Sequence, residues 1–189
     1  MGEGSLLLGF VTLQRLAELA LANRNTRQLR AAGAIEYGRR HYPAIVTLHA
    51  AWLAGLWGLG YGSPVDRVFL MGFAVLQGAR IWVIASLGRR WTTRVMVLAG
   101  EPLVRRGPYR FLRHPNYLVV ALEIAVVPLA LGLPRYAAVF FVLNVVVLLV
   151  RIRAENTALA WATGADREAR GVSPRGSPDR TLANSERSL

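Results

Sequence analysis

The sequence predicts an all-α integral membrane protein, a bundle of about five transmembrane helices whose last two form a helical hairpin. Three observations support this prediction. The 189 residues are 53% hydrophobic, and the apolar residues gather in long runs. Arginines concentrate in alternate gaps between those runs. Finally, Gly132-Leu133-Pro134 separates the last two runs by a break short enough for a tight helical turn.

Each of the five apolar runs is close to the ~20 residues that a helix needs to cross a bilayer. Charged residues lie inside three of them: Arg15 and Glu18, then Arg80, then Glu123. Ionisable side chains within a membrane either serve a function or pair inside the bundle, for example Arg80 with Glu123, and the sequence leaves both interpretations open. The runs extend approximately over Ser5–Ala22, Pro43–Tyr61, Val65–Leu87, Tyr117–Leu133 and Tyr136–Val150.

The gaps between the runs alternate between arginine-rich and arginine-poor. The first gap holds five arginines and the third holds seven, whereas the second, at 62–64, holds none and the fourth holds only Arg135. Arg151 and Arg153 follow the last run. Because cytoplasmic loops of membrane proteins are enriched in Lys and Arg, this alternation predicts an external N-terminus and a cytoplasmic C-terminus.

Residues 1–163 are predicted to form a single transmembrane domain. Within the first gap, Ala31 to Ala34 is interpreted as a short helix lying in the membrane interface. From Gly164 the composition changes to Gly, Ser, Pro and Arg without apolar periodicity. Residues 164–189 are therefore predicted to be a disordered tail.

The formal net charge is +12, and arginine accounts for all the Lys and Arg in the chain. Such a balance invites a nucleic-acid interpretation, but the arginines follow the membrane topology, so no nucleic-acid partner is predicted. The chain has no cysteine, which excludes disulfides, thiolate metal ligands and a cysteine nucleophile. No metal site is predicted.

The most informative stretch precedes the fourth run and reads RRGPYRFLRHPNY, from Arg105 to Tyr117. Its prolines and glycine impose an irregular backbone, which is tolerated at a membrane boundary where it lines a cavity or is covered by protein. Its arginines, His114 and tyrosines suit a small charged ligand. The alternative is an ordinary basic loop that contacts anionic headgroups. Pro115 suits the first turn of the following helix.

A second polar cluster, Arg151 to Asn156, follows the fifth run. The predicted hairpin brings this cluster to the same membrane face as His114. Arginines at a helix C-terminus complement the helix dipole and anchor the helix, so they need no functional role. Glu155, set among arginines, is either a member of a surface salt bridge or part of a site.

The segment GPYRFLRHPNYL, followed by the hairpin and then by RIRAEN, resembles the isoprenylcysteine carboxyl methyltransferase family. That family has an Arg-His-Pro-x-Tyr motif before a hairpin and an acidic motif, usually two glutamates, after it. The second motif is matched at Glu155, and Asn156 occupies the next position. The first motif is matched at Arg113, His114, Pro115 and Tyr117.

The stretch from Arg24 to Pro43 is similar to small bacterial members of this family, which are often associated with polyketide synthases that make long-chain pyrones and resorcinols. The resemblance implies a protein of the bacterial inner (plasma) membrane. It also implies an S-adenosylmethionine-dependent methyltransferase with its cofactor site in residues 88–117 and 150–160. The implied catalytic residues are His114, Glu155 and Arg153. The implied cofactor-binding residues are Gly107, Tyr109, Arg113, His114, Pro115, Tyr117 and Glu155.

The acceptor implied by the resemblance is a lipophilic small molecule that reaches the site from the surrounding membrane lipid. It is either the hydroxyl of a long-chain polyketide pyrone or resorcinol, or a prenylcysteine-like carboxylate. A polyketide synthase and a second copy of the chain are the protein partners left open. The alternatives are a phospholipid N-methyltransferase or related membrane reductase, and a non-enzymatic scaffold or transporter subunit that uses Arg80 and Glu123 as its polar path.

Overall fold

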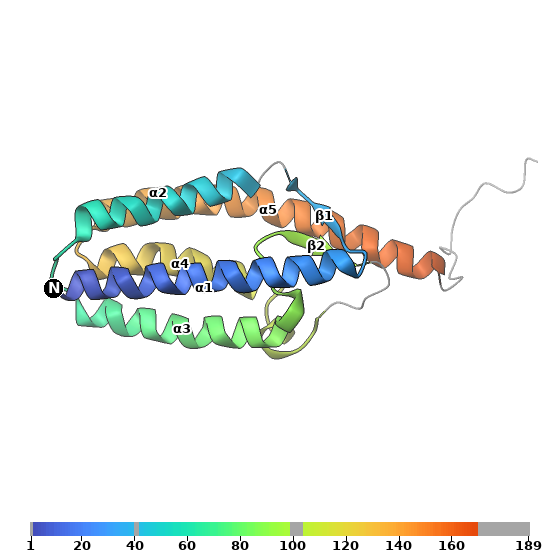
Figure 1. The fold of residues 1–189 in the computed structure, drawn as a ribbon, viewed down its shortest axis with the longest axis horizontal. Coiled ribbons are helices and arrows are strands. Elements are labelled where there is room, and N and C mark those ends of the chain that lie inside the picture. The colour runs from blue at the N-terminus through green and yellow to red at the C-terminus, as the bar shows by residue number, and fades with distance from the viewer. Residues whose placement is uncertain (1, 40–41, 99–103, 170–189) are drawn as a thin grey trace, which may run out of the picture.

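A computed structural model describes residues 2–39, 42–98 and 104–169, and its five long helices lie side by side along one axis (Figure 1). The N-terminus lies at one end of the bundle. The small sheet of β1 and β2 lies at the other end, from which α5 projects. In chain order the elements are α1 Glu3–Ala31, β1 Ile35–Tyr37, α2 Tyr42–Gly60, α3 Arg67–Leu87, the 3-10 turn η2 Gly88–Arg90, β2 Val95–Val97, the 3-10 turn η3 Gly107–Arg110, α4 Pro115–Ala130 and α5 Pro134–Ala169.

Local sequence explains where the helices begin and turn. The Asp66 side chain caps α3 by accepting hydrogen bonds from two backbone N–H groups of its first turn. Pro115 opens α4, where a missing N–H costs nothing. Gly132, with φ of +72°, lies in the short turn between α4 and α5. The helical hairpin predicted from this break is therefore present.

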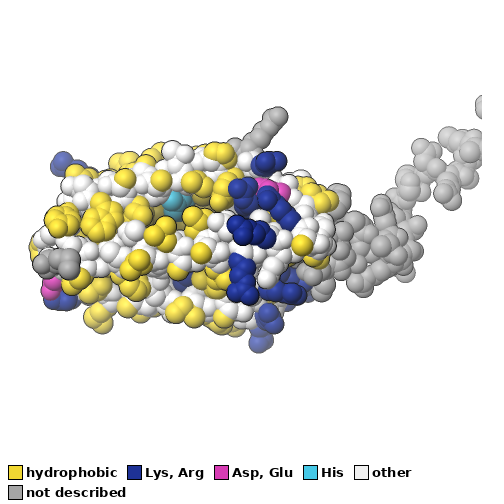
Figure 2. Space-filling model, in the orientation of Figure 1, with side chains coloured by type: hydrophobic (Ala, Val, Ile, Leu, Met, Phe, Trp, Pro, Cys, Tyr) yellow, Lys and Arg dark blue, Asp and Glu magenta, His cyan; other side chains and the backbone are white. Residues whose placement is uncertain are grey.

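Among the described residues, four helices, α1, α2, α3 and α5, are long and apolar enough to cross a membrane, and the protein is an integral membrane protein. The remaining predicted crossing, the fourth run, corresponds to α4, which has only 16 residues and at 1.5 Å per residue is about 24 Å long. It runs beside the others within the bundle (Figure 1). Hydrophobic side chains cover the body of the molecule, and arginines form a band across it near the sheet (Figure 2).

The interior is layered along the bundle axis. An apolar layer away from the sheet contains Leu8, Trp52 and Ile124, all fully buried. A second apolar layer nearer the sheet is formed by Ala22, Val83, Trp91 and Val119. Between the two layers lie two arginines and two glutamates that we call the ionic cluster. Its members are Arg15, Glu18, Arg80 and Glu123.

Two sequence predictions need correction. The interfacial helix expected at Ala31 to Ala34 is absent. Helix α1 continues unbroken to Ala31, and a turn at Gly33, whose φ is +89°, follows its end. The β-branched Ile35 then opens a strand that pairs antiparallel with β2. The tail expected from Gly164 also begins too early, since α5 is helical to Ala169. Residues 170–189 of the predicted tail lie outside the described residues.

Candidate active site

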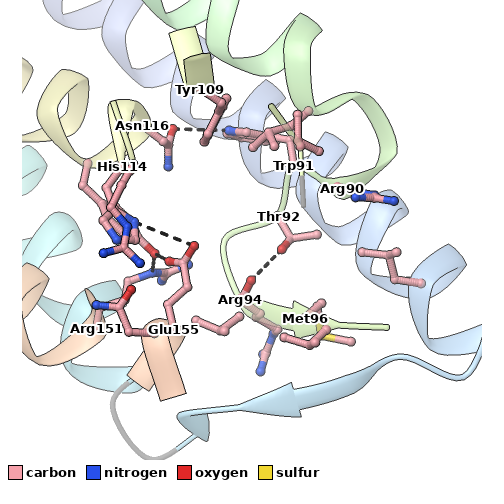
Figure 3. A pocket seen from close by; sticks show the side chains of 18 of the residues that line it. Arg90, Trp91, Thr92, Arg94, Met96, Tyr109, His114, Asn116, Arg151 and Glu155 are labelled. Carbon is pink, nitrogen blue, oxygen red and sulfur yellow. Dashed lines mark hydrogen bonds and ion pairs between the residues drawn. The ribbon is translucent and has the colours of Figure 1, made fainter. Parts of the chain in front are cut away.

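A cavity of about 430 Å³ lies at the sheet end of the bundle. Residues 90–98, which follow α3 and include β2, form one wall. The segment from Arg105 to Tyr117 forms a second wall, and α5 contributes a third (Figure 3). Cavities of this size are typical of small-molecule sites. Both polar clusters singled out in the sequence therefore reach one cavity.

Tyr117 is the centre of a hydrogen-bond chain that joins α4, α5 and the segment before β2. Its hydroxyl donates to Glu155 Oε2 and accepts a hydrogen bond of 2.8 Å from Arg151 Nε. Arg151 Nη1 also donates to the Thr93 carbonyl oxygen at 2.7 Å. The carboxylate and the guanidinium are thus held in place by partners from other elements.

His114 is the residue immediately before α4. Its ring stacks on the ring of Tyr117 with centroids 5.5 Å apart, and its Nδ1 atom lies 4.0 Å from Glu155 Oε1 (Figure 3). An imidazole and a carboxylate, both common in general acid–base catalysis, therefore lie beside one cavity. The hairpin brings these two side chains together across 41 positions of sequence, as the sequence predicted.

Helix α1 supports the wall formed after α3. The buried Asn25 donates from Nδ2 to the Trp91 carbonyl oxygen at 2.7 Å. The Trp91 indole in turn donates to Asn116 Oδ1 at 3.4 Å, so the amide nitrogen of Asn116 is on the side away from Trp91 (Figure 3). On α5, the buried side-chain oxygen of Asn156 has no hydrogen-bond partner within the described chain. The cavity therefore presents uncharged polar groups as well as charges.

Positive side chains dominate the electrostatics of the cavity. Among the described lining residues there are five arginines but a single acid, Glu155. Burial, followed by the charge of Glu155, raises the pKa of the Tyr109 phenol, which is therefore neutral near pH 7. The site offers guanidinium groups to anionic oxygens and one carboxylate to a cation. The described residues contain no group of three or more His, Asp or Glu that could hold a metal ion.

Comparison with known proteins identifies the family. The sequence profile of the isoprenylcysteine carboxyl methyltransferase (ICMT) family matches residues 68–161. The uncharacterised protein YpbQ of Bacillus subtilis is 38% identical over 167 residues, which cover 82% of this chain and 95% of that protein. The chain belongs to the ICMT family. An uncharacterised protein of Haemophilus influenzae is 27% identical over 161 residues, which cover 77% of this chain and 88% of that protein. No solved structure matches the chain.

The ICMT family is a methyltransferase family, and the matched region extends from α3 into α5. It therefore includes nearly every residue that lines the cavity. Helix α1 lies outside the match, yet it contributes Leu29 to the lining and Asn25 to its support. This ICMT member thus builds one wall of its site with help from a helix outside the matched region.

The structure divides the site residues predicted from the ICMT resemblance into two groups. Gly107 and Pro115 do not line the cavity but shape its wall: Gly107 has φ of +57° and packs against Ser86, and Pro115 is buried at the start of α4. Arg153 is exposed on α5 and is not a lining residue. The roles assigned to all of these residues stay predictions. The predicted residues that line the cavity are Tyr109, Arg113, His114, Tyr117 and Glu155.

Sequence reasoning missed several residues of the ICMT site. Arg151 was interpreted only as a helix anchor, although it precedes Glu155 by four positions and therefore shares its helix face. That spacing could have identified it. Trp91, Thr93 and Arg94 also contribute to the site. No sequence pattern marks these three, because their position depends on how the segment after α3 folds against α1.

Proposed function

We propose that this ICMT member is an S-adenosylmethionine-dependent O-methyltransferase that acts on a lipid-like acceptor at the cytoplasmic face of the membrane. One observation carries the proposal: in a methyltransferase family, His114, Tyr117 and Glu155 meet in a cavity at the arginine-rich end of a membrane bundle. An acceptor that is apolar over most of its length would approach this cavity from the bilayer.

The lining of the cavity fits the cofactor chemically. S-adenosylmethionine carries a carboxylate, an ammonium, a sulfonium and an adenine, and it supplies an electrophilic methyl group when bound. Arg113 suits the carboxylate, because a guanidinium can form two parallel hydrogen bonds with it. Glu155 suits the ammonium, and the aromatic faces of Tyr109 and Trp91 suit the adenine or the sulfonium. The unpaired oxygen of Asn156 offers an acceptor to an N–H or O–H group.

The charges that line the cavity also favour an oxygen over an amine as the methyl acceptor. Five lining arginines against one acid stabilise an oxygen that carries negative charge, as in an enolate, a phenolate or a carboxylate. A hydroxyl acceptor must lose its proton, and His114 or Glu155 is the candidate base. The amine acceptor of a phospholipid N-methyltransferase would gain nothing from this charge. We favour a long-chain polyketide hydroxyl, because the segment from Arg24 to Pro43 is similar to family members associated with polyketide synthases.

Binding to the detergent-solubilised protein tests the proposal. Isothermal titration should show saturable S-adenosylmethionine binding, weakened by at least about 10-fold in His114→Ala and Glu155→Gln, because each change removes a charged or polar contact. Thr157→Ala is the matched control, since its exposed hydroxyl bonds only to the backbone of its own helix. Binding of reduced nicotinamide in place of S-adenosylmethionine would identify a reductase, and binding of neither would support a scaffold or transporter subunit.

Transfer of a labelled methyl group then distinguishes the acceptors. Alkylpyrones and alkylresorcinols should be methylated in preference to a prenylated cysteine. Preference for the prenylated cysteine would retain the O-methyltransferase but contradict the polyketide assignment.

A further inference from the structure

The segment 105–113, which we call the interfacial loop, returns toward the bilayer beside the end of α3. Arg106 Nε donates to the Ser86 carbonyl oxygen at 2.8 Å. At Gly107 an added methyl group would come within 3.2 Å of Trp82 Nε1, so the backbone there lies directly against α3. The apolar span of α3 extends from Arg67 to Arg90. The loop is therefore level with the last turns of a membrane-spanning helix, not beyond them.

Two apolar side chains of the interfacial loop are exposed. Phe111 is 74% exposed and Leu112 is 47% exposed. Both side chains directly follow η3, whose Gly107 lies against Trp82 of α3. Near this level of a membrane-spanning helix, an exposed side chain meets lipid or the interfacial layer. Aromatic residues are enriched in that layer, where a ring can lie among the headgroups and upper acyl chains. Contact with lipid would explain the exposure of Phe111.

The arginines of the same loop can bind the charged headgroups of lipids, next to the apolar side chains. The loop contains four arginines and no acid, and all four side chains are exposed. Figure 2 shows a band of basic side chains across the molecule near the sheet. Guanidinium groups at this level of a membrane meet lipid phosphates and gain most from anionic lipids. The arginines are Arg105, Arg106, Arg110 and Arg113.

We propose that the interfacial loop inserts Phe111 and Leu112 into the membrane interface and that Arg106 and Arg110, the arginines of this loop that do not line the cavity, bind the headgroups of anionic phospholipids. Arg105, Tyr109 and Arg113 of this loop line the cavity. Anionic lipid is therefore a specific partner that orders one wall of the site. The proposal rests on the depth and charge of the loop and does not depend on the methyltransferase reaction.

Because the chain has no cysteine, single cysteines can be labelled cleanly. A spin label at Phe111→Cys, in vesicles of phosphatidylcholine and phosphatidylglycerol, should collide more often with oxygen than with a water-soluble nickel chelate. Val75→Cys, at a side chain that is 73% exposed within α3, is the reference for lipid. Ala32→Cys, at the end of α1, is the reference for water. A label at 111 that behaves like the label at 32 would overturn the insertion.

The preference for anionic lipid is tested with a fluorophore attached at Phe111→Cys. Brominated phosphatidylglycerol should quench it more strongly than brominated phosphatidylcholine. Arg110→Gln should reduce this preference about fivefold, the contribution of one arginine near an anionic surface. Arg110 does not line the cavity, and Arg135→Gln at the opposite end of the bundle is the matched control. Equal quenching by both lipids, or equal effects of the two substitutions, would refute the binding of anionic headgroups.

Discussion

At the scale of single residues, hydrogen bonds among neighbouring side chains hold Glu155 in the site. A glutamate set among arginines on a helix would ordinarily be a solvated carboxylate. Here Tyr117 donates to it, and Arg151 donates to Tyr117. Charge-assisted hydrogen bonds are stronger than neutral ones, so the three side chains form one arrangement. Loss of one member should disturb the other two.

Substitution of two arginines on α5 distinguishes the contribution of this hydrogen-bonded arrangement from a general effect of positive charge. Arg151→Gln should weaken S-adenosylmethionine binding by about 10- to 100-fold, because a hydrogen bond to a charged group contributes roughly 1.5–3 kcal/mol. Arg153→Gln, at an exposed side chain outside the cavity, should change it by less than about threefold. Isothermal titration of both variants provides the measurement. Equal losses would mean that positive charge near α5 matters more than contact with Tyr117.

At the scale of secondary-structure elements, the sheet depends on an ion pair network. Strands of three residues are not stable alone. Glu36 of β1 accepts hydrogen bonds of 2.5 Å from both Arg30, in the last turn of α1, and Arg94, just before β2. The Arg94 guanidinium also lies 4.0 Å from the ring centroid of Tyr42 in α2. Glu36 thus joins the end of α1 to the cavity wall.

This network should make the sheet sensitive to acid. Partial burial raises the pKa of Glu36, but the hydrogen bonds and charges of Arg94 and Arg30 outweigh it and hold the pKa below its usual 4.5. Such a carboxyl contributes stability that is complete above its unfolded-state pKa and is lost as the pH falls through its folded-state pKa. The protection factors of the amides in β1 and β2, which allow for the slower intrinsic exchange in acid, should therefore fall as the pH falls through this range.

Glu36→Gln removes the titrating group and supplies the control. Its protection factors in the sheet should no longer fall in acid over this range, and its loss of stability at neutral pH should be below about 1 kcal/mol, as for partly exposed ion pairs. Hydrogen exchange of Ile35 to Tyr37 and Val95 to Val97 measures both effects. An unchanged acid transition in the variant would assign it to another carboxyl.

The elements also show what sequence could and could not predict. Hydropathy located α2 and α3 within two residues at each end, because long apolar runs leave few alternatives. It ends α1 at Ala22, since Asn25 and Thr26 look like loop residues, although both are buried and Asn25 is hydrogen-bonded to the segment after α3. The strands are too short to show a period, and their pairing depends on residues far apart in sequence. Motif residues of the site were predictable, whereas residues placed only by tertiary contacts were not.

At the scale of the whole molecule, the ionic cluster joins α1 to α3 and α4 between the two apolar layers. Arg80 Nη2 lies 2.6 Å from Glu123 Oε2, and Arg15 Nη2 lies 2.7 Å from the same oxygen. Arg80 Nε also lies 3.0 Å from Glu18 Oε1. Two arginines and two glutamates make the cluster neutral. The predicted pairing of Arg80 with Glu123 is present, and it favours a role in holding the bundle together.

Removing charges singly or in pairs tests that role. Glu123→Leu leaves the guanidinium groups of Arg15 and Arg80 with only Glu18 between them and should destabilise the protein by about 3–5 kcal/mol. The double variant Arg80→Met, Glu123→Leu keeps the cluster neutral, because Arg15 retains Glu18, and should recover most of that loss. Thermal unfolding in detergent, followed by tryptophan fluorescence, measures both.

Because an apolar layer separates the cluster from the cavity, the stable double variant should also bind S-adenosylmethionine normally. A double variant that is stable but cannot bind or turn over its ligands would show that the ionic cluster has a functional role, beyond holding the bundle together.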